Sequence, residues 1–270
     1  MSRVHPRLGL NSLSTAGWPL EQDLEFYADL DVHRAGLYLD KLLACGEERA
    51  IGLIAAAGLQ VDHLFARGVV PSDPGSWADD RRRLLGALEL AAEMGVPVLT
   101  ITTGSAGPLS WDEAAAGLAQ ALGPVLAEAR RRSMTVAIEQ TLPVRVEVGF
   151  VHSFRDSAEL ADRLGVGVVL EAGYCFAERD LGRSVRSAGQ ALTLVQLSDL
   201  VIPSAAIPDR AVPGDGVIPL ERIVGLALRS GYDGAFEIEM LGPRIEAEGY
   251  EPACRRAVTF VDELLTRLGA

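Results

Sequence analysis

LTLVQLSD (residues 192–199) and AFEIEM (235–240) are two short runs of mostly aliphatic residues, and a helical pattern covers 219–230 between them. A strand, a helix and a second strand in this order are typical of a βαβ unit with parallel strands. The same alternation continues back to the start of the chain, which predicts eight strand–helix pairs. The eight predicted strands cover residues 7–10, 35–39, 60–66, 96–102, 135–140, 166–172, 192–199 and 235–240.

Eight consecutive βα units predict a protein of the α/β class, either a closed (β/α)8 TIM barrel or a large open doubly wound sheet. The length of 270 residues suits a barrel, and no G-x-G-x-x-G turn follows the first predicted strand. We therefore expect a single (β/α)8 barrel domain over residues 1–270. The predicted helix ends agree with this, because Ser110 and Glu113 have the spacing of a capping box and several strands follow a glycine that can end a helix.

The composition is that of a globular protein with a large core, since 49% of the residues are hydrophobic and 23% are charged. A net charge of −12 opposes binding to phosphate backbones, so we expect no nucleic-acid partner. The N-terminus lacks the apolar run of a secretory signal, and no long apolar segment follows. We expect a cytoplasmic protein without membrane contact. The three cysteines, Cys45, Cys175 and Cys254, are too far apart for a metal knuckle and are expected to be reduced thiols.

Four polar residues lie where predicted strands five to eight end. Because the carboxyl ends of barrel strands meet at one mouth, these residues are the first candidates for an active site. Three buried carboxylates repel one another unless a cation or proton compensates, which favours a divalent metal, with Mn²⁺ or Mg²⁺ suited to oxygen ligands. The alternative is that some of the glutamates point outward and pair with helix arginines. The four residues are Glu139, Glu171, Gln196 and Glu239.

The motifs of the second half of the chain resemble those of the xylose-isomerase-like barrel superfamily. They are VAIEQ (136–140), LEAGY (170–174), VQLSD (195–199) and the PGDG turn that precedes a helix, GYDG and a strand-end Glu (213–239). That superfamily includes sugar epimerases, hydroxypyruvate isomerase, inosose dehydratase and endonuclease IV. The resemblance covers residues 135–240 by motif and the first half by architecture only.

The resemblance implies that Glu139, Glu171, Gln196 and Glu239 hold a metal, and that Glu139 and Glu239 exchange a proton with the substrate. Two positions depart from the family pattern, because Glu171 stands for an Asp and Gln196 for a His. Tyr174 also stands where relatives have a substrate-binding His. The chain contains only four histidines, which excludes the histidine-rich, multi-zinc site of the nuclease branch.

Four further residues near the mouth are candidates for substrate binding. Arg210 lies where the relatives place a substrate-contacting Arg, and Arg244 follows the eighth strand. His63, in the third strand, is either a mouth residue or a hydrogen-bonded core histidine. Arg145 also lies near the mouth. Each arginine has a simpler alternative, which is to anchor a loop, and Arg244 in particular could pair with Glu246 or Glu248.

The leading hypothesis is an isomerase or epimerase that transfers a proton next to the carbonyl of a sugar or related keto compound. Glu139 and Glu239 would be the acid and base, and a metal would stabilise the enediolate. Isomerisation, epimerisation and dehydration share that intermediate. One alternative is metal-independent acid/base chemistry, including a lyase or dehydratase, on a less polar substrate. Another is an inactive barrel that serves as a binding subunit. The expected partner is a small-molecule substrate, and a homo-oligomer is one of the assemblies that the sequence leaves open.

Overall fold

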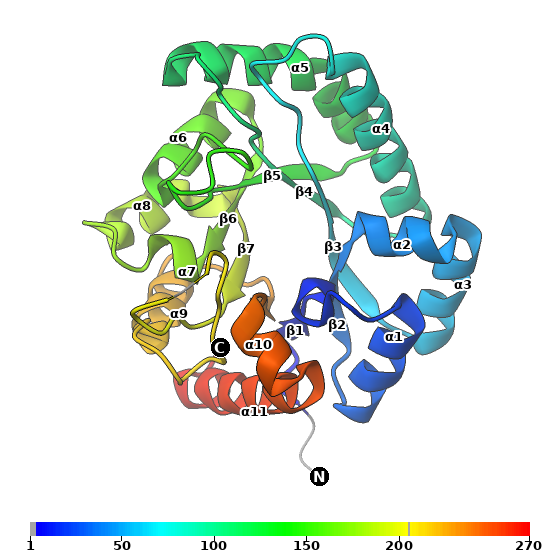
Figure 1. Cartoon of the computed structure of the whole chain (residues 1–270), viewed down its shortest axis with the longest axis vertical. Coiled ribbons are helices and arrows are strands. Elements are labelled where there is room, and N and C mark those ends of the chain that lie inside the picture. The colour runs from blue at the N-terminus through cyan, green and yellow to red at the C-terminus, as the bar shows by residue number, and fades with distance from the viewer. Residues whose placement is uncertain (1–3, 205) are drawn as a thin grey trace.

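The computed structural model describes residues 4–204 and 206–270, and in that part of the chain eight parallel strands form one sheet. Each strand pairs with its neighbour in sequence from β2 to β8, and β8 pairs with β1, so the sheet curls into a nearly closed barrel. Figure 1 looks down the barrel, with the helices arranged around the strands. The strands are β1 (Leu8–Leu10), β2 (Arg34–Tyr38), β3 (Gln60–Ala66), β4 (Val98–Thr102), β5 (Thr135–Glu139), β6 (Gly167–Glu171), β7 (Leu192–Leu197) and β8 (Phe236–Ile238).

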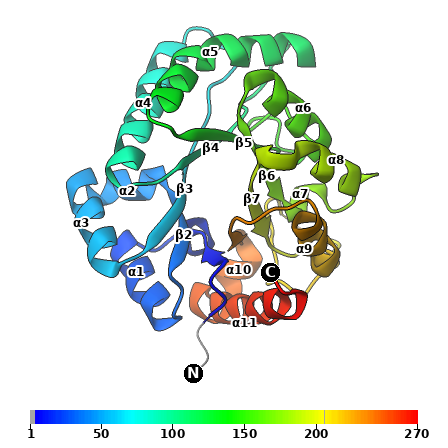
Figure 2. The same ribbon diagram turned by 180° about the vertical axis from the view of Figure 1, so that it is seen from behind.

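The helices pack their apolar faces on the outside of the barrel, and Figure 2 shows the helices around the strands from behind. The longest of them, α5, begins with the predicted capping box, in which Ser110 accepts from the Glu113 N–H and Glu113 accepts from the Ser110 N–H. The helices are α1 (Leu20–Asp29), α2 (Leu39–Cys45), α3 (Glu47–Ala57), α4 (Trp77–Glu93), α5 (Trp111–Arg131), α6 (Phe154–Leu164), α7 (Ala172–Cys175), α8 (Leu181–Ala188), α9 (Leu220–Arg229), α10 (Pro243–Glu248) and α11 (Tyr250–Leu268), with short 3-10 turns η1 (Ser12–Thr15) and η2 (Gly189–Ala191).

The barrel fold confirms the prediction, and the strand ends lie within a few residues of those expected. The structure adds three short helices, α2, α7 and α10. The first two directly follow β2 and β6, and α10 begins a few residues after β8. The sequence did not predict them. Helices of this length gain little from their own hydrogen bonds and depend on packing against the rest of the fold.

Two layers of side chains fill the inside of the barrel on β5, β6 and β7. Near the strand starts, Ala137, Val169 and Leu194 form a small apolar cluster of their own. Two residues further along the same strands lie Glu139, Glu171 and Gln196. Because side chains two residues apart point to the same face of a strand, the polar layer lies directly above the apolar one, toward the barrel mouth. The strand period thus brings the predicted polar residues together.

The loop of residues 200–218 is held by one buried carboxylate. Asp199 accepts hydrogen bonds from the backbone N–H groups of Leu200, Gly214 and Ile218, at 2.8, 3.0 and 2.9 Å. Gly214, in the PGDG turn, has a φ of +96°, which glycine adopts without strain. Asp199 and the PGDG turn therefore shape the loop that returns Arg210 to the barrel mouth.

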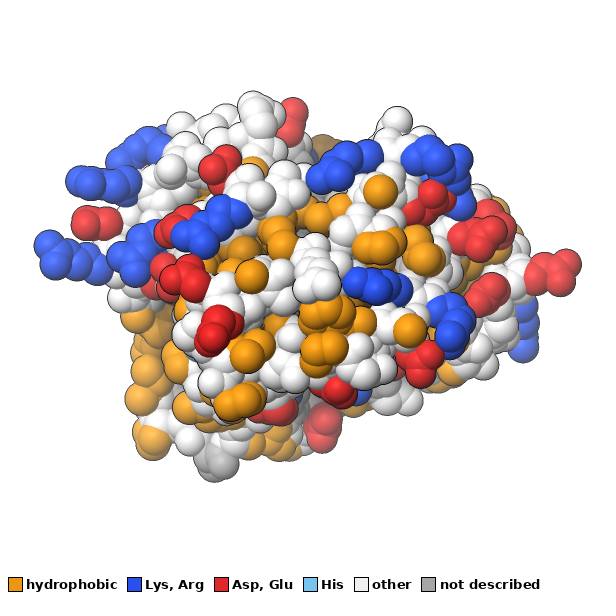
Figure 3. Space-filling model, turned by 90° about the horizontal axis from the view of Figure 1, so that it is seen from above, with side chains coloured by type: hydrophobic (Ala, Val, Ile, Leu, Met, Phe, Trp, Pro, Cys, Tyr) orange, Lys and Arg blue, Asp and Glu red, His pale blue; other side chains and the backbone are white. Residues whose placement is uncertain are grey.

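The outer face seen in Figure 3 carries charged side chains of both signs with apolar side chains between them. Within the described residues, none of the helices combines the length and apolar character that crossing a membrane requires.

Candidate active site

A cavity of about 680 Å³ lies at the carboxyl ends of the strands. Aromatic, polar and charged side chains from several strand ends and from the loops that follow β5 and β7 form its wall. They include Tyr38, Phe65, Thr102, Glu139, Arg145, Tyr174, Pro208 and Glu239. A cavity at this end of a parallel barrel is where the active sites of such barrels are found.

Glu139 and Glu239 are the two carboxyl groups of the polar layer that reach this cavity, although the residues are only 6% and 8% exposed. Burial, together with the charge of Glu171, raises the pKa of Glu139 to about 8 against the opposing charge of Arg210. Burial and the charge of Glu139 also raise the pKa of Glu239 well above its ordinary value. Because the two carboxyls interact, they release their protons in two coupled steps. Near a pH of about 8, where the first proton is lost, the pair can therefore both hold a proton and accept one.

The raised pKa of Glu139 predicts a cost in stability at high pH. Up to a pH of about 8 the folded chain keeps the proton, whereas the unfolded chain loses it near the ordinary value of 4.5, so stability falls as the pH rises through this window. Relative to the unchanged protein, we expect Glu139→Gln to gain about 4 kcal/mol of stability between pH 5 and pH 9. Urea unfolding at several pH values measures this.

The exposed Glu147 on the cavity wall provides the control for that experiment. Arg145 donates a hydrogen bond to Glu147 and lowers its pKa, so Glu147→Gln is expected to give no gain at high pH. A Glu139→Gln curve that runs parallel to that of the unchanged protein from pH 5 to pH 9 would show that Glu139 is ionised throughout.

Each carboxylate oxygen of Glu171 accepts a hydrogen bond from another side chain. Its Oε2 accepts a hydrogen bond from Arg210 Nη2 at 2.8 Å, and its Oε1 accepts one from the Ser198 hydroxyl at 3.2 Å. The Glu171 and Arg210 side chains are only 1% and 3% exposed, so this is a buried ion pair. The guanidinium also stacks on Tyr174, with 4.2 Å between its central carbon and the ring centroid. A Cβ at position 173 would lie 2.0 Å from Arg210 Nη1, so Gly173 leaves the space that the guanidinium fills.

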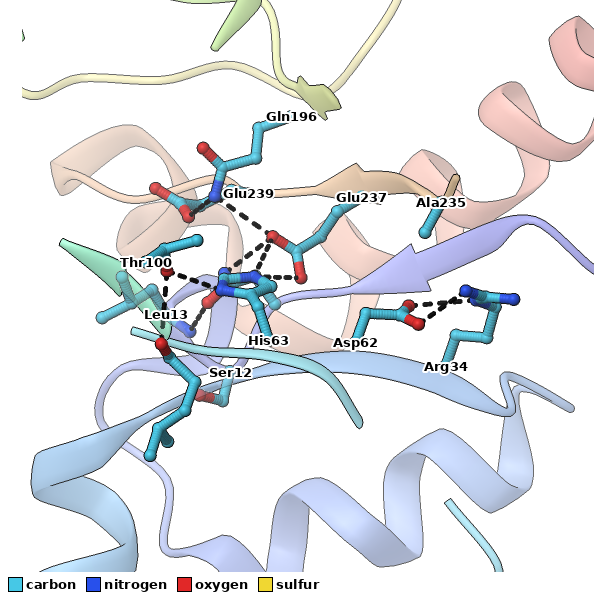
Figure 4. A network of polar contacts seen from close by, with 12 residues as sticks. Ser12, Leu13, Arg34, Asp62, His63, Thr100, Gln196, Ala235, Glu237 and Glu239 are labelled. Carbon is cyan, nitrogen blue, oxygen red and sulfur yellow. Dashed lines mark hydrogen bonds and ion pairs between the residues drawn. The ribbon is translucent and has the colours of Figure 1, made fainter. Parts of the chain in front are cut away.

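The Gln196 side chain joins Glu237 of β8 and Glu239, which directly follows that strand. Its Nε2 donates to Glu239 Oε2 at 2.6 Å and to Glu237 Oε2 at 3.1 Å, as Figure 4 shows. The Oε1 of Gln196 is buried and has no hydrogen-bond partner in the described part of the chain. Glu237 is itself 1% exposed and also bonds to Asn11 and His63.

A family model for the xylose isomerase-like TIM barrel matches residues 21–261 of the sequence. The chain belongs to this family. Solved structures share the fold over nearly the whole chain. The protein SMc04130 from Sinorhizobium meliloti 1021 is 23% identical, with a TM-score of 0.83 over 97% of this chain and 98% of that one. The IolI protein, solved with a binding zinc atom, is 17% identical, with a TM-score of 0.85 over 97% of this chain and 99% of that one.

A D-psicose 3-epimerase from Clostridium cellulolyticum H10, solved with D-tagatose, is 15% identical, with a TM-score of 0.77 over 96% of this chain and 99% of that one. At these identities the structures establish the fold alone. The xylose isomerase-like superfamily includes epimerases, isomerases and AP endonucleases. A search of curated proteins gave no match to the sequence.

The metal site implied by the family resemblance does not fit the side chains as they lie. Both oxygens of Glu171 are engaged, and Gln196 turns toward Glu239 its NH₂ group, which offers no lone pair to a cation. A metal between these residues would also lie beside the Arg210 guanidinium. Among residues 4–204 and 206–270, no group of three or more His, Cys, Asp or Glu side chains is arranged to hold a metal ion. The metal thus stays a prediction from the resemblance.

The residues predicted to bind substrate lie at different depths. Tyr174 lines the cavity, whereas Arg210 is 2% exposed and lies against the Tyr174 ring. Arg244 is partly exposed, and it pairs with Asp209 at 3.6 Å rather than with either glutamate considered from the sequence. His63 is 1% exposed and bonds to Glu237, which matches the core-histidine alternative.

Glu237 is the residue of this site that the sequence analysis missed. It lies two residues before Glu239 on β8, and strand period two places both side chains on the inner face. The register of the sheet sets it opposite Gln196. The alternation in FEIE was thus the available signal, although alternation alone does not say which face of a strand points inward.

Proposed function

We propose that this protein is an isomerase- or epimerase-type enzyme that transfers a proton next to the carbonyl of a sugar or related keto compound. The observation that carries the proposal is the pair of buried, interacting carboxyls, Glu139 and Glu239, at one cavity. Their raised pKa values suit proton exchange near neutral pH, since general acids and bases work best when their pKa lies near the operating pH.

As the pH approaches the pKa of about 8, the pair loses its first proton and supplies one ionised and one protonated carboxyl. The ionised member takes the proton from the carbon next to the carbonyl, and the electron pair of that C–H bond forms the double bond of an enediol. The protonated member gives its proton to the carbonyl oxygen. Return of a proton to the former carbonyl carbon, with loss of the hydroxyl proton of the first carbon, gives an isomer. Return of a proton to the first carbon from the other face, with loss of the proton on the former carbonyl oxygen, gives an epimer.

The Arg210 guanidinium is a positive charge that acts on both carboxyls. Its charge opposes the rise in the pKa of both Glu139 and Glu239, so its field reaches both carboxyls. The same field favours an enediolate in this part of the barrel. We propose that Arg210, held by Glu171 and Tyr174, is the resident cation and that the reaction needs no metal. The zinc atom in the IolI structure makes the opposite expectation the natural one to test.

The experiment is exchange of carbon-bound protons in D₂O, followed by NMR across a panel of ketoses, keto acids and keto-cyclitols. Protein treated with a chelator is compared with the same protein loaded with Mn²⁺ or Mg²⁺, and elemental analysis of protein purified without chelator accompanies both. Exchange by the chelated sample supports the metal-independent proposal. Exchange only in samples with stoichiometric metal contradicts it. Absence of exchange from both samples across the panel favours a binding subunit instead.

A further inference from the structure

A second polar layer lies behind Gln196, away from the cavity, and its centre is the pair His63 and Glu237. His63 Nε2 is 3.0 Å from both carboxylate oxygens of Glu237, and both side chains are 2% exposed. On the other side of the ring, His63 Nδ1 is 2.7 Å from the Thr100 hydroxyl. Figure 4 shows the chain of contacts from Thr100 through His63 and Glu237 to Gln196.

Hydrogen bonds on both sides of the ring hold His63 in place. The Thr100 hydroxyl lies 2.7 Å from His63 Nδ1 and anchors that side of the ring to β4. On the other side, Nε2 faces the carboxylate of Glu237 and, because a carboxylate can only accept, donates to it. The ring is therefore fixed between Thr100 and Glu237.

Other groups around Glu237 agree with an ionised carboxylate. Burial alone raises the pKa of Glu237, but the charge and hydrogen bond of His63, with the hydrogen bonds of Asn11 and Gln196, outweigh it and leave this pKa below its ordinary value. Asn11 Nδ2 donates to Glu237 Oε2 at 2.9 Å. Every neighbour that bonds to this carboxylate is thus a donor.

An ionised Glu237 also sets the orientation of the Gln196 amide. A carboxylate can only accept, so the amide atom 3.1 Å from Glu237 Oε2 is the NH₂ nitrogen and not the oxygen. The second hydrogen of that nitrogen points to Glu239 Oε2 at 2.6 Å. The buried Gln196 Oε1 has no partner among the described residues, so the two glutamates hold the amide in place although its oxygen goes unpaired.

We propose that His63 and Glu237 are positioning residues that act on Glu239 through Gln196. The amide N–H occupies Glu239 Oε2, so the proton that Glu239 gives or takes lies on Oε1, the oxygen that points away from Gln196 in Figure 4. This inference deepens the proposed function and rests on it for the role of Glu239. It adds two residues, behind the cavity, that determine which oxygen of the acid takes part.

The barrel leaves space for this pair at one glycine. A Cβ at position 36 would lie 2.1 Å from both Glu237 Oε1 and His63 Nε2. Gly36→Ala is therefore expected to displace the pair while leaving the chemical identity of every side chain in the network unchanged. It is a second way to disturb the pair, independent of Glu237→Gln.

The first experiment needs no substrate and so is separate from any test of the proposed function. In protein labelled with ¹⁵N-histidine and ¹⁵N-glutamine, His63 is expected to show a proton on Nε2, and the Gln196 NH₂ group to exchange slowly with solvent. In Glu237→Gln the signal of the Nε2 proton is expected to change and the amide to exchange at least tenfold faster. A His63 ring without a proton on Nε2 in the unchanged protein, or a Gln196 amide unaffected by Glu237→Gln, would overturn the inference.

The exposed His33 and Asp31 form the matched control, since their nitrogen and oxygen are 2.9 Å apart but both side chains are about half exposed. Asp31→Asn is expected to alter the His33 signals and leave those of Gln196 unchanged. If Asp31→Asn shifts the Gln196 signals as much as Glu237→Gln does, the buried pair has no special role.

The second experiment uses the proton-exchange reaction on whichever compound of the panel is turned over. Glu237→Gln and Gln196→Leu are each expected to reduce kcat about tenfold with KM little changed, and the double variant to be no slower than the slower single one. Because groups that act through one another are not additive, this result supports action through Gln196. A double variant about a hundredfold slower would show two independent effects and contradict the proposal.

Discussion

Replacing Glu239 with glutamine is expected to slow proton exchange by about 10²–10⁴-fold, the usual contribution of a general acid or base. The change keeps the size of the side chain and its hydrogen bond to Gln196 can be remade by the new carbonyl oxygen, so the loss reflects the missing proton rather than a cavity. Because Glu239 is proposed to exchange a proton with the substrate rather than to hold it, kcat is expected to fall with KM little changed. NMR detection of deuterium uptake measures the rate, with Glu147→Gln as the control from the cavity wall.

The pH dependence of the same reaction adds a check that does not rely on a variant. Burial and the charge of Glu171 raise the pKa of Glu139 to about 8, so one limb of the rate profile is expected to bend near that pH. In Glu139→Gln that limb should disappear. A Glu239→Gln variant with turnover within threefold of the unchanged protein would rule out the assignment of Glu239 as acid or base.

The fold was predictable because its signals are local and repeated. Each strand is a short aliphatic run, and the capping box at Ser110 and Glu113 marks the start of α5 where the structure has it. The short helices α2, α7 and α10 were not predictable in the same way, since residues such as Ala172 and Gly173 carry no helical pattern of their own. Their positions depend on the barrel mouth against which they pack.

The candidate site was predictable at the strand ends and less so beyond them. Glu139, Glu171 and Gln196 share one layer because each lies two residues beyond a member of the apolar cluster Ala137, Val169 and Leu194 on its strand, and the register of β6 and β7 sets Glu171 opposite Gln196. The ion pair of Glu171 with Arg210 joins residues 39 positions apart, through a loop whose course depends on Asp199. No local pattern encodes that contact. The sequence therefore identified the acids correctly as a cluster but not which cation lies beside them.

The Arg210 and Glu171 pair gives the largest stability effect that we expect. Arg210→Met keeps most of the side-chain volume but leaves the carboxylate of Glu171, 1% exposed, without its cation. Removing one partner of a buried ion pair costs about 3–5 kcal/mol, because the remaining charge stays desolvated. The urea midpoint of Arg210→Met is expected to fall accordingly at pH 7. Arg163→Met, which breaks an exposed i,i+4 pair with Glu159, is the control and is expected to move the midpoint little.

The double variant Arg210→Met with Glu171→Gln separates the charge effect from lost packing. If the cost comes from an uncompensated carboxylate, removing that charge is expected to restore more than half of the stability lost in Arg210→Met. The Tyr174 ring, which stacks on the guanidinium, can pack on a methionine side chain as well, so the double variant keeps most of this contact. A double variant as unstable as Arg210→Met would mean that the stacking and the space beside Gly173, rather than the ion pair, hold this part of the site together. Recovery would instead identify Arg210 as the cation that compensates the buried carboxylate of Glu171.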